Sequence, residues 1–241
     1  MKRRDVLVGT GAAVLGGLAG CLGTLGMDEH ESAPASVEEP VRDETEYELV
    51  GVEPMTIVEE FSAAGSSEEV RVTNHSTDFE KTVEMGPLGE QEAAVFSVLT
   101  TPQISLFGRE FNPVADMSTE ELAEMIADDF DEIENITHDL DDTVTILDQE
   151  TTRSRFEADS QFGGQDVEVY IHVTESVETS TDDFAVAVGV YPQEFHDDEG
   201  ENTVAMMEGV IDDADIDVEN GSSDDDGETT DDDDGETTDD D

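Results

Sequence analysis

The excess of acidic residues is the feature that most constrains what this chain can fold into. Its 241 residues include 66 aspartates and glutamates but 9 lysines and arginines, for a formal net charge of -57. Repulsion at this density loosens a compact fold in dilute buffer, whereas in molar salt the Debye length falls to about 3 Å and neighbouring carboxylates scarcely repel. The charge therefore predicts a protein of a halophile. It also excludes nucleic acid as a partner, because phosphate binding needs clustered basic side chains.

A disordered acidic chain is the other structure that such a composition allows. The middle of the sequence argues against it, because apolar residues alternate there as in Val167, Val169 and Ile171, which is typical of a strand with one buried face. Residues 219–241 instead repeat the unit DDDGETT and contain no apolar residue. We therefore expect one folded domain over residues 45–218 and a disordered acidic tail over 219–241.

The N-terminus has the parts of an export signal. The basic pair Arg3 and Arg4 precedes a short apolar, glycine-rich segment over residues 6–19. The pair looks like a twin-arginine export signal, and the following LAGC, which ends at Cys21, looks like a lipobox. Small residues there fit the processing peptidase, and the cysteine sulfur takes the lipid. We expect a signal peptide over residues 1–20 and lipid attachment at Cys21.

Lipid on Cys21 would hold the protein at the extracellular face of the cell membrane. Its partners would then include the membrane and the export and lipoprotein-processing machinery. An uncleaved signal anchor, with Cys21 as a bystander, is the alternative. Cys21 is the only cysteine of the chain, so no disulfide can form within it. The polar residues 21–44, with Pro34 and Pro40, are expected to form a tether.

The domain is predicted to have two helices among many strands. Ser118 and Glu121 form a capping box at the start of a helix over 118–131, and a second helix is expected over 202–212. Small residues alternate with valines over 183–191, so an element should pack closely on that strand. The sequence FGGQ, residues 162–165, predicts a hairpin turn between the strands over 151–158 and 166–175, because paired glycines tolerate positive φ. Consecutive strands with short turns favour an antiparallel sheet. We therefore expect an α+β fold, a mainly antiparallel sheet with about two helices packed on one face. Strands are expected over 47–52, 55–61, 70–74, 79–85, 93–101, 104–111, 143–148, 151–158, 166–175 and 183–191.

One long segment supports a family resemblance. With the export signal, the sequence MGPLGEQEAAVFSVLTTPQISLFGREFNPVADMSTEELAEMI, residues 85–126, resembles a family of haloarchaeal lipoproteins built on a domain of unknown function. The segments VYIHVTESVE (169–178) and FAVAVGVYPQ (184–193) fit the same pattern. The resemblance covers most of residues 1–215. It implies localisation and domain extent, and it carries no activity, cofactor or binding residue.

Motifs that carry chemistry do not stand out in this sequence. The five histidines show no metal-ligand spacing, and the nucleophile elbow, the phosphate-binding loop and the dinucleotide-binding motif have no match. The run that begins at His196 and continues with three acidic residues has the groups to hold a cation, but such clusters arise by chance in this composition. We therefore predict no enzyme activity, no cofactor and no metal site.

Basic side chains are informative because they are scarce. The retained arginines are most simply explained by ion pairs with carboxylates. The alternative is that Arg153 and Arg155, two residues apart on one strand face, form an anion or partner site. His172 is a further candidate for this site, although it alternates with valines and is expected on a solvated face.

These observations rank the candidate functions by their support in the sequence. The first is a lipid-anchored, non-enzymatic surface module that binds an unknown surface protein or a small ligand, or has an envelope role. The second is a solute-binding lipoprotein associated with a transporter, and the third is an exported hydrolase.

Asn74, Asn135 and Asn220 begin N-glycosylation sequons, which an exported protein is able to use.

Overall fold

The computed structural model describes residues 27–212 except for 64–65, 107–108, 112–113, 115–116, 130–132 and 163–164. Arg3, Arg4, Cys21 and the acidic tail over 219–241 lie outside the described residues, as does Asn220. The predictions of signal peptide, lipid attachment and tail therefore stay predictions. Within the described residues, no helix is both long and apolar enough to cross a membrane.

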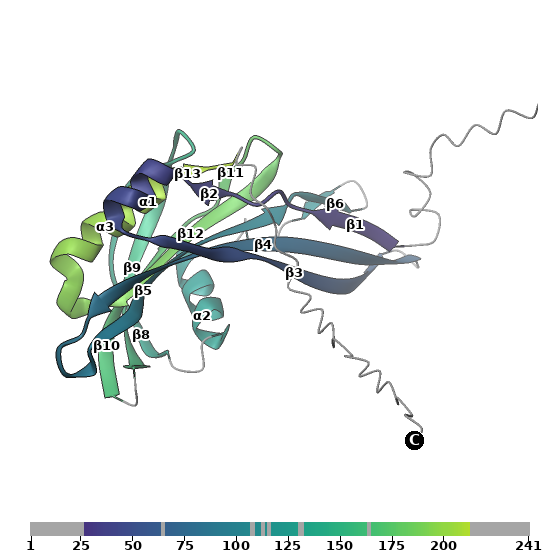
Figure 1. The fold of residues 1–241 in the computed structure, drawn as a ribbon. Coiled ribbons are helices and arrows are strands. Elements are labelled where there is room, and N and C mark those ends of the chain that lie inside the picture. Colours follow the sequence, from purple (N-terminus) through teal and green to yellow (C-terminus); the bar gives the residue numbers. More distant parts are fainter. Residues whose placement is uncertain are drawn as a thin grey trace, which may run out of the picture.

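A nine-stranded mixed sheet forms the centre of the molecule (Figure 1). Its order is β1-β4-β5-β12-β10-β9-β8, with β3 paired to β4 and β11 paired to β12. β1 runs parallel to β4, and the other paired strands are antiparallel. The strands are β1 (Met27–Glu31), β3 (Glu48–Ala63), β4 (Ser66–Glu84), β5 (Glu90–Pro102), β8 (Glu134–Ile146), β9 (Gln149–Phe162), β10 (Gln165–Thr174), β11 (Val177–Glu178) and β12 (Asp183–Pro192).

Helices cover both faces of this sheet. α1 (Glu39–Thr45) and α3 (His196–Glu208) lie together on one face, and α2 (Thr119–Asp129) lies on the other (Figure 1). Short 3-10 turns, η1 (Gly86–Leu88) and η2 (Gln193–Phe195), precede β5 and α3. Two small ribbons complete the fold: β2 (Ser36–Val37) with β13 (Val210–Ile211), and β6 (Ile104–Leu106) with β7 (Arg109–Phe111).

This architecture shows that the predicted fold class is wrong. The sequence predicts a mainly antiparallel sheet with about two helices on one face. The described chain is instead mostly β, with a mixed nine-stranded sheet and three α-helices divided between its faces. The mixed character comes from β1, whose sequence MDEHE has no apolar alternation. Backbone pairing with β4 holds this strand, so hydrophobic periodicity cannot reveal it.

The folded part also begins earlier than the predicted domain start at residue 45. β1, β2 and α1 all come from the segment 21–44 that is expected to be a tether. Ala35 and Val37 are buried in the main hydrophobic core, and Thr77 Oγ1 donates a hydrogen bond of 2.6 Å to the carbonyl of Ala35. Few apolar residues in this polar segment are enough to attach it to the sheet.

Two local predictions agree with the structure. The backbone N–H of Ser118 donates to Glu121 Oε2 at 2.9 Å, and the N–H of Glu121 donates to Ser118 Oγ at 3.3 Å, which is the expected capping box of α2. On β12, Ala185 and Ala187 face the main core, whereas Val186 packs with α2. The small residues admit α3 closely, as expected. The second predicted helix is shifted, because α3 begins at residue 196 and ends at 208.

Candidate functional site

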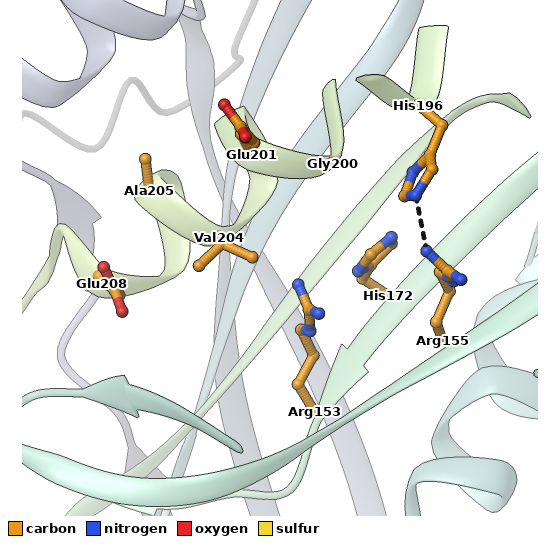
Figure 2. Close-up of a pocket in the computed structure, with 9 residues that line it drawn as sticks. All are labelled: Arg153, Arg155, His172, His196, Gly200, Glu201, Val204, Ala205 and Glu208. Atoms are coloured by element: carbon orange, nitrogen blue, oxygen red, sulfur yellow. Dashed lines mark hydrogen bonds between the residues drawn. The ribbon is translucent and has the colours of Figure 1, made fainter. Parts of the chain in front are cut away.

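A pocket of about 300 Å³ lies between the sheet and α3. Arg153 and Arg155 of β9 and His172 of β10 line it from the sheet (Figure 2). The structure therefore brings together the three residues that the sequence identifies as a possible anion or partner site. The α3 side of the pocket is formed by His196, Gly200, Glu201, Val204, Ala205 and Glu208.

Strand register explains why these three residues meet. His172 is the direct partner of Arg155 in the antiparallel β9–β10 pair, so both side chains leave the sheet on the same face. Arg153 lies two residues away on β9 and shares that face. In Figure 2 the His172 ring lies between the two arginines. The predicted hairpin between β9 and β10 is confirmed by the pairing of Phe162 with Gln165, and it fixes this register.

Helix α3 is held over the pocket by a buried polar cluster. Glu199, in the first turn of α3, is 3% exposed. Its Oε1 lies 2.8 Å from Nζ of Lys81, and its Oε2 accepts a hydrogen bond of 3.1 Å from the Tyr47 hydroxyl. Glu199, the half-buried Lys81 of β4 and the buried Tyr47 just before β3 thus fix the N-terminal end of the helix. A buried carboxylate needs such partners, because an unpaired charge in the interior is costly.

A chain of hydrogen bonds runs from Arg155 into the sheet. Arg155 Nη1 lies 2.9 Å from His196 Nε2, His196 Nδ1 lies 2.9 Å from Tyr191 Oη, and Tyr191 Oη lies 2.8 Å from His172 Nε2. A guanidinium only donates, so His196 accepts at Nε2 and donates from Nδ1 to the tyrosine. The tyrosine then donates its own proton to Nε2 of His172. This order leaves the proton of neutral His172 on Nδ1.

That Nδ1 is the distinctive atom of the pocket. His172 is 1% exposed, and its Nδ1 has no hydrogen-bond partner among the described residues. Leaving a buried donor unsatisfied costs about 1–3 kcal/mol. The wall of the pocket therefore contains a buried N–H group that has no acceptor among the described residues.

Burial keeps the groups of this chain neutral. It lowers the pKa of His172 to about 2, and the charges of Arg153 and Arg155 act in the same direction. Burial, and then the charge of Arg155, lowers the pKa of His196 as well. The pKa of the Tyr191 hydroxyl is raised, again mainly by burial. Near neutral pH the hydrogen-bond chain thus contains two neutral imidazoles and a neutral phenol.

Both arginines also form ion pairs, the simpler of the two explanations for their presence. Arg153 makes a bidentate contact with Asp142, in which Nε lies 2.8 Å from Oδ1. Arg155 contacts Asp139 Oδ2 through Nε at 2.7 Å and Nη2 at 2.6 Å, and its guanidinium lies 4.5 Å from the centre of the Tyr170 ring. These contacts hold the guanidinium groups in fixed orientations beside His172. The ion-pair and site explanations are therefore compatible.

The expectation of a solvated His172 is wrong. The sequence distinguishes the two faces of β10, but it does not show that both are covered, one by α2 and the other by α3. Sequence reasoning also missed Tyr191 as a site residue. It considered His196 for a cation instead, and the described residues contain no cluster of His, Cys, Asp and Glu suited to a metal ion. The short separation of Tyr191 and His196 at a strand-to-helix junction is a signal that was available.

A second buried polar cluster contains a serine and a histidine in contact. Ser32 Oγ lies 3.3 Å from His75 Nδ1, and His75 Nε2 lies 3.7 Å from Glu31 Oε1. Ser32 and His75 are each 3% exposed, and the serine hydroxyl also donates to the Thr100 carbonyl at 3.1 Å. A hydroxyl that is buried and bonded to the backbone is poorly placed to attack a substrate. We interpret this cluster as an attachment of β1 to the sheet.

Among the sequons, two asparagines lie in the described residues. Asn74 is 8% exposed within β4, which leaves no space for a glycan in the folded protein. Asn135 is exposed near the start of β8.

The fold and the pocket define a mixed-sheet domain in which a helix closes a cavity of small-molecule size. Residues 34–211 match the family described as Domain of unknown function (DUF6517). This match covers more than half of the 241 residues, and the chain belongs to that family. No curated protein matches the chain. The family extends from β2 to β13, so it includes every residue that lines the pocket.

Proposed function

We propose that this protein is a lipid-anchored, non-enzymatic surface module of a halophile that binds a small carboxylate-bearing ligand in the pocket beneath α3. The observation that carries the proposal is the buried Nδ1–H of His172, which has no partner in the described part of the chain and lies beside two fixed arginines. A carboxylate oxygen would accept from this donor and recover the desolvation cost of about 1–3 kcal/mol. Arg153 and Arg155 would add the positive field that a carboxylate needs.

The α3 side of the pocket narrows the class of ligand. Glu201 and Glu208 line it there, and the two arginines are already paired with aspartates, so the pocket has no large excess of positive charge. A simple anion matches only the His172 side. A zwitterion matches both, with its carboxylate toward His172 and its ammonium toward the glutamates. The cavity of about 300 Å³ suits a molecule of the size of an amino acid.

The anchor and the location rest on the sequence. Arg3 and Arg4 before the apolar segment, and LAGC ending at Cys21, support export and lipid attachment. The first described strand starts at Met27, six residues after this cysteine. The domain would therefore be held close to the membrane on its outer side, where an extracellular ligand has access to it.

Ligand titration in molar potassium chloride tests the pocket. The probes are a panel of free amino acids, with the corresponding amines and carboxylic acids for comparison, measured by isothermal calorimetry. We expect amino acids to bind better than either single-charge analogue. His172→Phe keeps a ring in place but removes the donor, and it should lower affinity by about tenfold, equivalent to about 1.4 kcal/mol. His138→Phe, on exposed β8 outside the pocket, is the matched control.

A second variant tests the pocket even if His172→Phe does not fold. Ala205→Leu fills the pocket from α3 without touching the hydrogen-bond chain, and it should also weaken binding. Circular dichroism would report whether each variant folds. If a folded His172→Phe protein binds the panel as the unaltered protein does, or if the unaltered protein binds none of it, the proposed ligand class is wrong.

A transporter-associated solute-binding lipoprotein is the second candidate, because the same pocket would serve to capture a solute. Affinity purification of the membrane-bound protein in strong salt separates the two. Recovery of a permease would favour this candidate over a module that acts alone.

A further inference from the structure

One end of the sheet extends beyond the rest as an arm, made of residues 53–63 of β3 and 66–74 of β4. β5 pairs with residues 75–84 of β4 and with none of residues 66–74. This part of β4 has β3 on one side, and β1 pairs with its residues 69–73 on the other side. Figure 1 shows this arm projecting from the body of the domain, on the side away from α3 and therefore away from the pocket.

The exposed apolar side chains of the described residues gather on β3. The large ones with the highest exposure are Leu49, Val50, Met55, Ile57 and Val58. Three of these five lie on the arm, within four consecutive positions. Ile57 pairs with Val72 across the strands and Met55 shares its face, so they extend the small apolar cluster of Val70, Val72 and Ile104 into the open. Contiguous apolar surface of this kind marks a contact with a protein or a membrane.

The path of the N-terminal chain favours a membrane over a protein as the contact of the arm. β1 starts with Met27 opposite Glu69, close to the end of the arm, where Ala63 pairs with Ser66. Cys21 lies six residues before Met27. Six residues span at most about 20 Å when fully extended. A lipid on Cys21 would therefore bring the end of the arm, and not the pocket, next to the bilayer.

A second copy of the chain is the less suitable occupant. Two copies would pair through the free edge of β3, and Pro54 lacks the N–H group that such a ladder requires. Glu53 and Glu48 would also lie on the shared edge of both copies. A bilayer surface needs no backbone pairing with the strand.

We propose that the arm rests on the lipid bilayer, with Met55 and Ile57 inserted among the lipid headgroups. This inference rests on the proposed lipid anchor at Cys21. The anchor supplies attachment, and the arm supplies a second contact that orients the domain. Single lipid chains bind membranes reversibly, so a second contact strengthens attachment. The pocket then faces away from the membrane.

The test uses the full-length, lipidated protein in vesicles of phosphatidylglycerol and phosphatidylcholine, in molar potassium chloride. Because Cys21 is the only native cysteine, Ile57→Cys introduces one thiol that accepts an environment-sensitive dye. Val50→Cys is the matched control. Val50 lies on the same strand and is 60% exposed against 50% for Ile57, but it is about 23 Å away along the strand. A fraction of the lipids carries nitroxide quenchers on the acyl chains.

We expect a blue-shifted dye at position 57 that is quenched several-fold more strongly than the dye at position 50. Equal quenching at the two positions would overturn the proposed contact. So would oxidation of unlabelled Ile57→Cys protein to a disulfide-linked dimer in the same vesicles, because that result identifies a second copy as the occupant. Mass spectrometry of the same sample reports the anchor separately. Lipidated Cys21 with an unquenched position 57 refutes the arm contact alone, whereas unmodified Cys21 refutes the anchor.

Discussion

Replacing Gly189 with alanine tests how closely α3 packs on the strand that supports the pocket. The new Cβ would lie 2.5 Å from Cγ2 of Thr203, a fully buried side chain of α3, and 3.6 Å from Cδ2 of Phe96. Carbon atoms in contact usually lie about 3.5–4.0 Å apart, so α3 or β12 must move by about 1 Å. Overpacking of this kind costs about 1–3 kcal/mol of folding free energy. We expect Gly189→Ala to destabilise the domain by that amount.

A second substitution separates this clash from other effects of alanine. Thr203→Ser removes the clashing Cγ2 methyl and keeps the hydroxyl. The double variant should therefore recover most of the lost stability, with a coupling free energy of about 1–2 kcal/mol in a double-mutant cycle. Gly51→Ala is the control, because a Cβ at Gly51 has nothing within 4 Å.

Urea unfolding at a fixed, high salt concentration measures these differences. The midpoint should fall for Gly189→Ala at an unchanged slope, remain near the original value for Gly51→Ala, and rise again in the double variant. The reasoning is refuted if Gly189→Ala is as stable as Gly51→Ala, or if Thr203→Ser brings no recovery.

Three further predictions follow from the capping box, the buried imidazole and the lipobox. Ser118→Ala should destabilise α2 by about 1 kcal/mol, measured by urea unfolding, and an unchanged midpoint would contradict the capping role. Burial lowers the pKa of His172 from 6.5 to about 2, so its contribution to folding stability is complete above pH 6.5. The contribution is lost as the pH falls, by about 2–3 kcal/mol over the next two pH units. His172→Gln should flatten this pH dependence of the unfolding free energy, and parallel stability curves for the two proteins would refute the role of His172. Cys21→Ser should be released into the medium or kept as uncleaved precursor, and mature-sized protein in the membrane fraction would refute the lipobox.

Local signals allowed parts of the fold to be predicted. The Ser118 capping box and the β9–β10 hairpin depend on residues close in sequence, so their structural meaning does not need the rest of the molecule. The small residues of β12 also predict close packing without knowledge of the rest of the fold, because only a neighbouring element at short distance requires small side chains there.

Elements that are held in the sheet mainly by backbone pairing could not be predicted from the sequence. Three of the five residues of β1 are acidic, and its place depends on β4 more than forty residues away. β3 was expected as two strands around Pro54, but it is one strand. Proline is tolerated there because β3 lies at an edge, where the missing N–H interrupts no ladder. Whether a strand lies at an edge is a property of the whole sheet.

The candidate site was predicted in part. Arg153 and Arg155 stood out because basic residues are rare in this chain, and their spacing placed them on one strand face. His172 was placed on the correct face but in the wrong environment, since its burial depends on α3. The role of Tyr191 depends on a contact between strand and helix that no periodicity encodes.

The parallel pairing of β1 with β4 has a mechanical consequence. β1 begins at the end of the arm and runs back toward the body of the domain, so a pull on the chain before Met27 acts along the strand axis. In this shear geometry, the hydrogen bonds of the ladder bear the load together instead of breaking one by one. Just beyond β1, the N–H of Ala33 donates to Asp183 at 2.8 Å and passes tension to the central strand β12. The domain is thus constructed to withstand traction on its N-terminal chain without a disulfide.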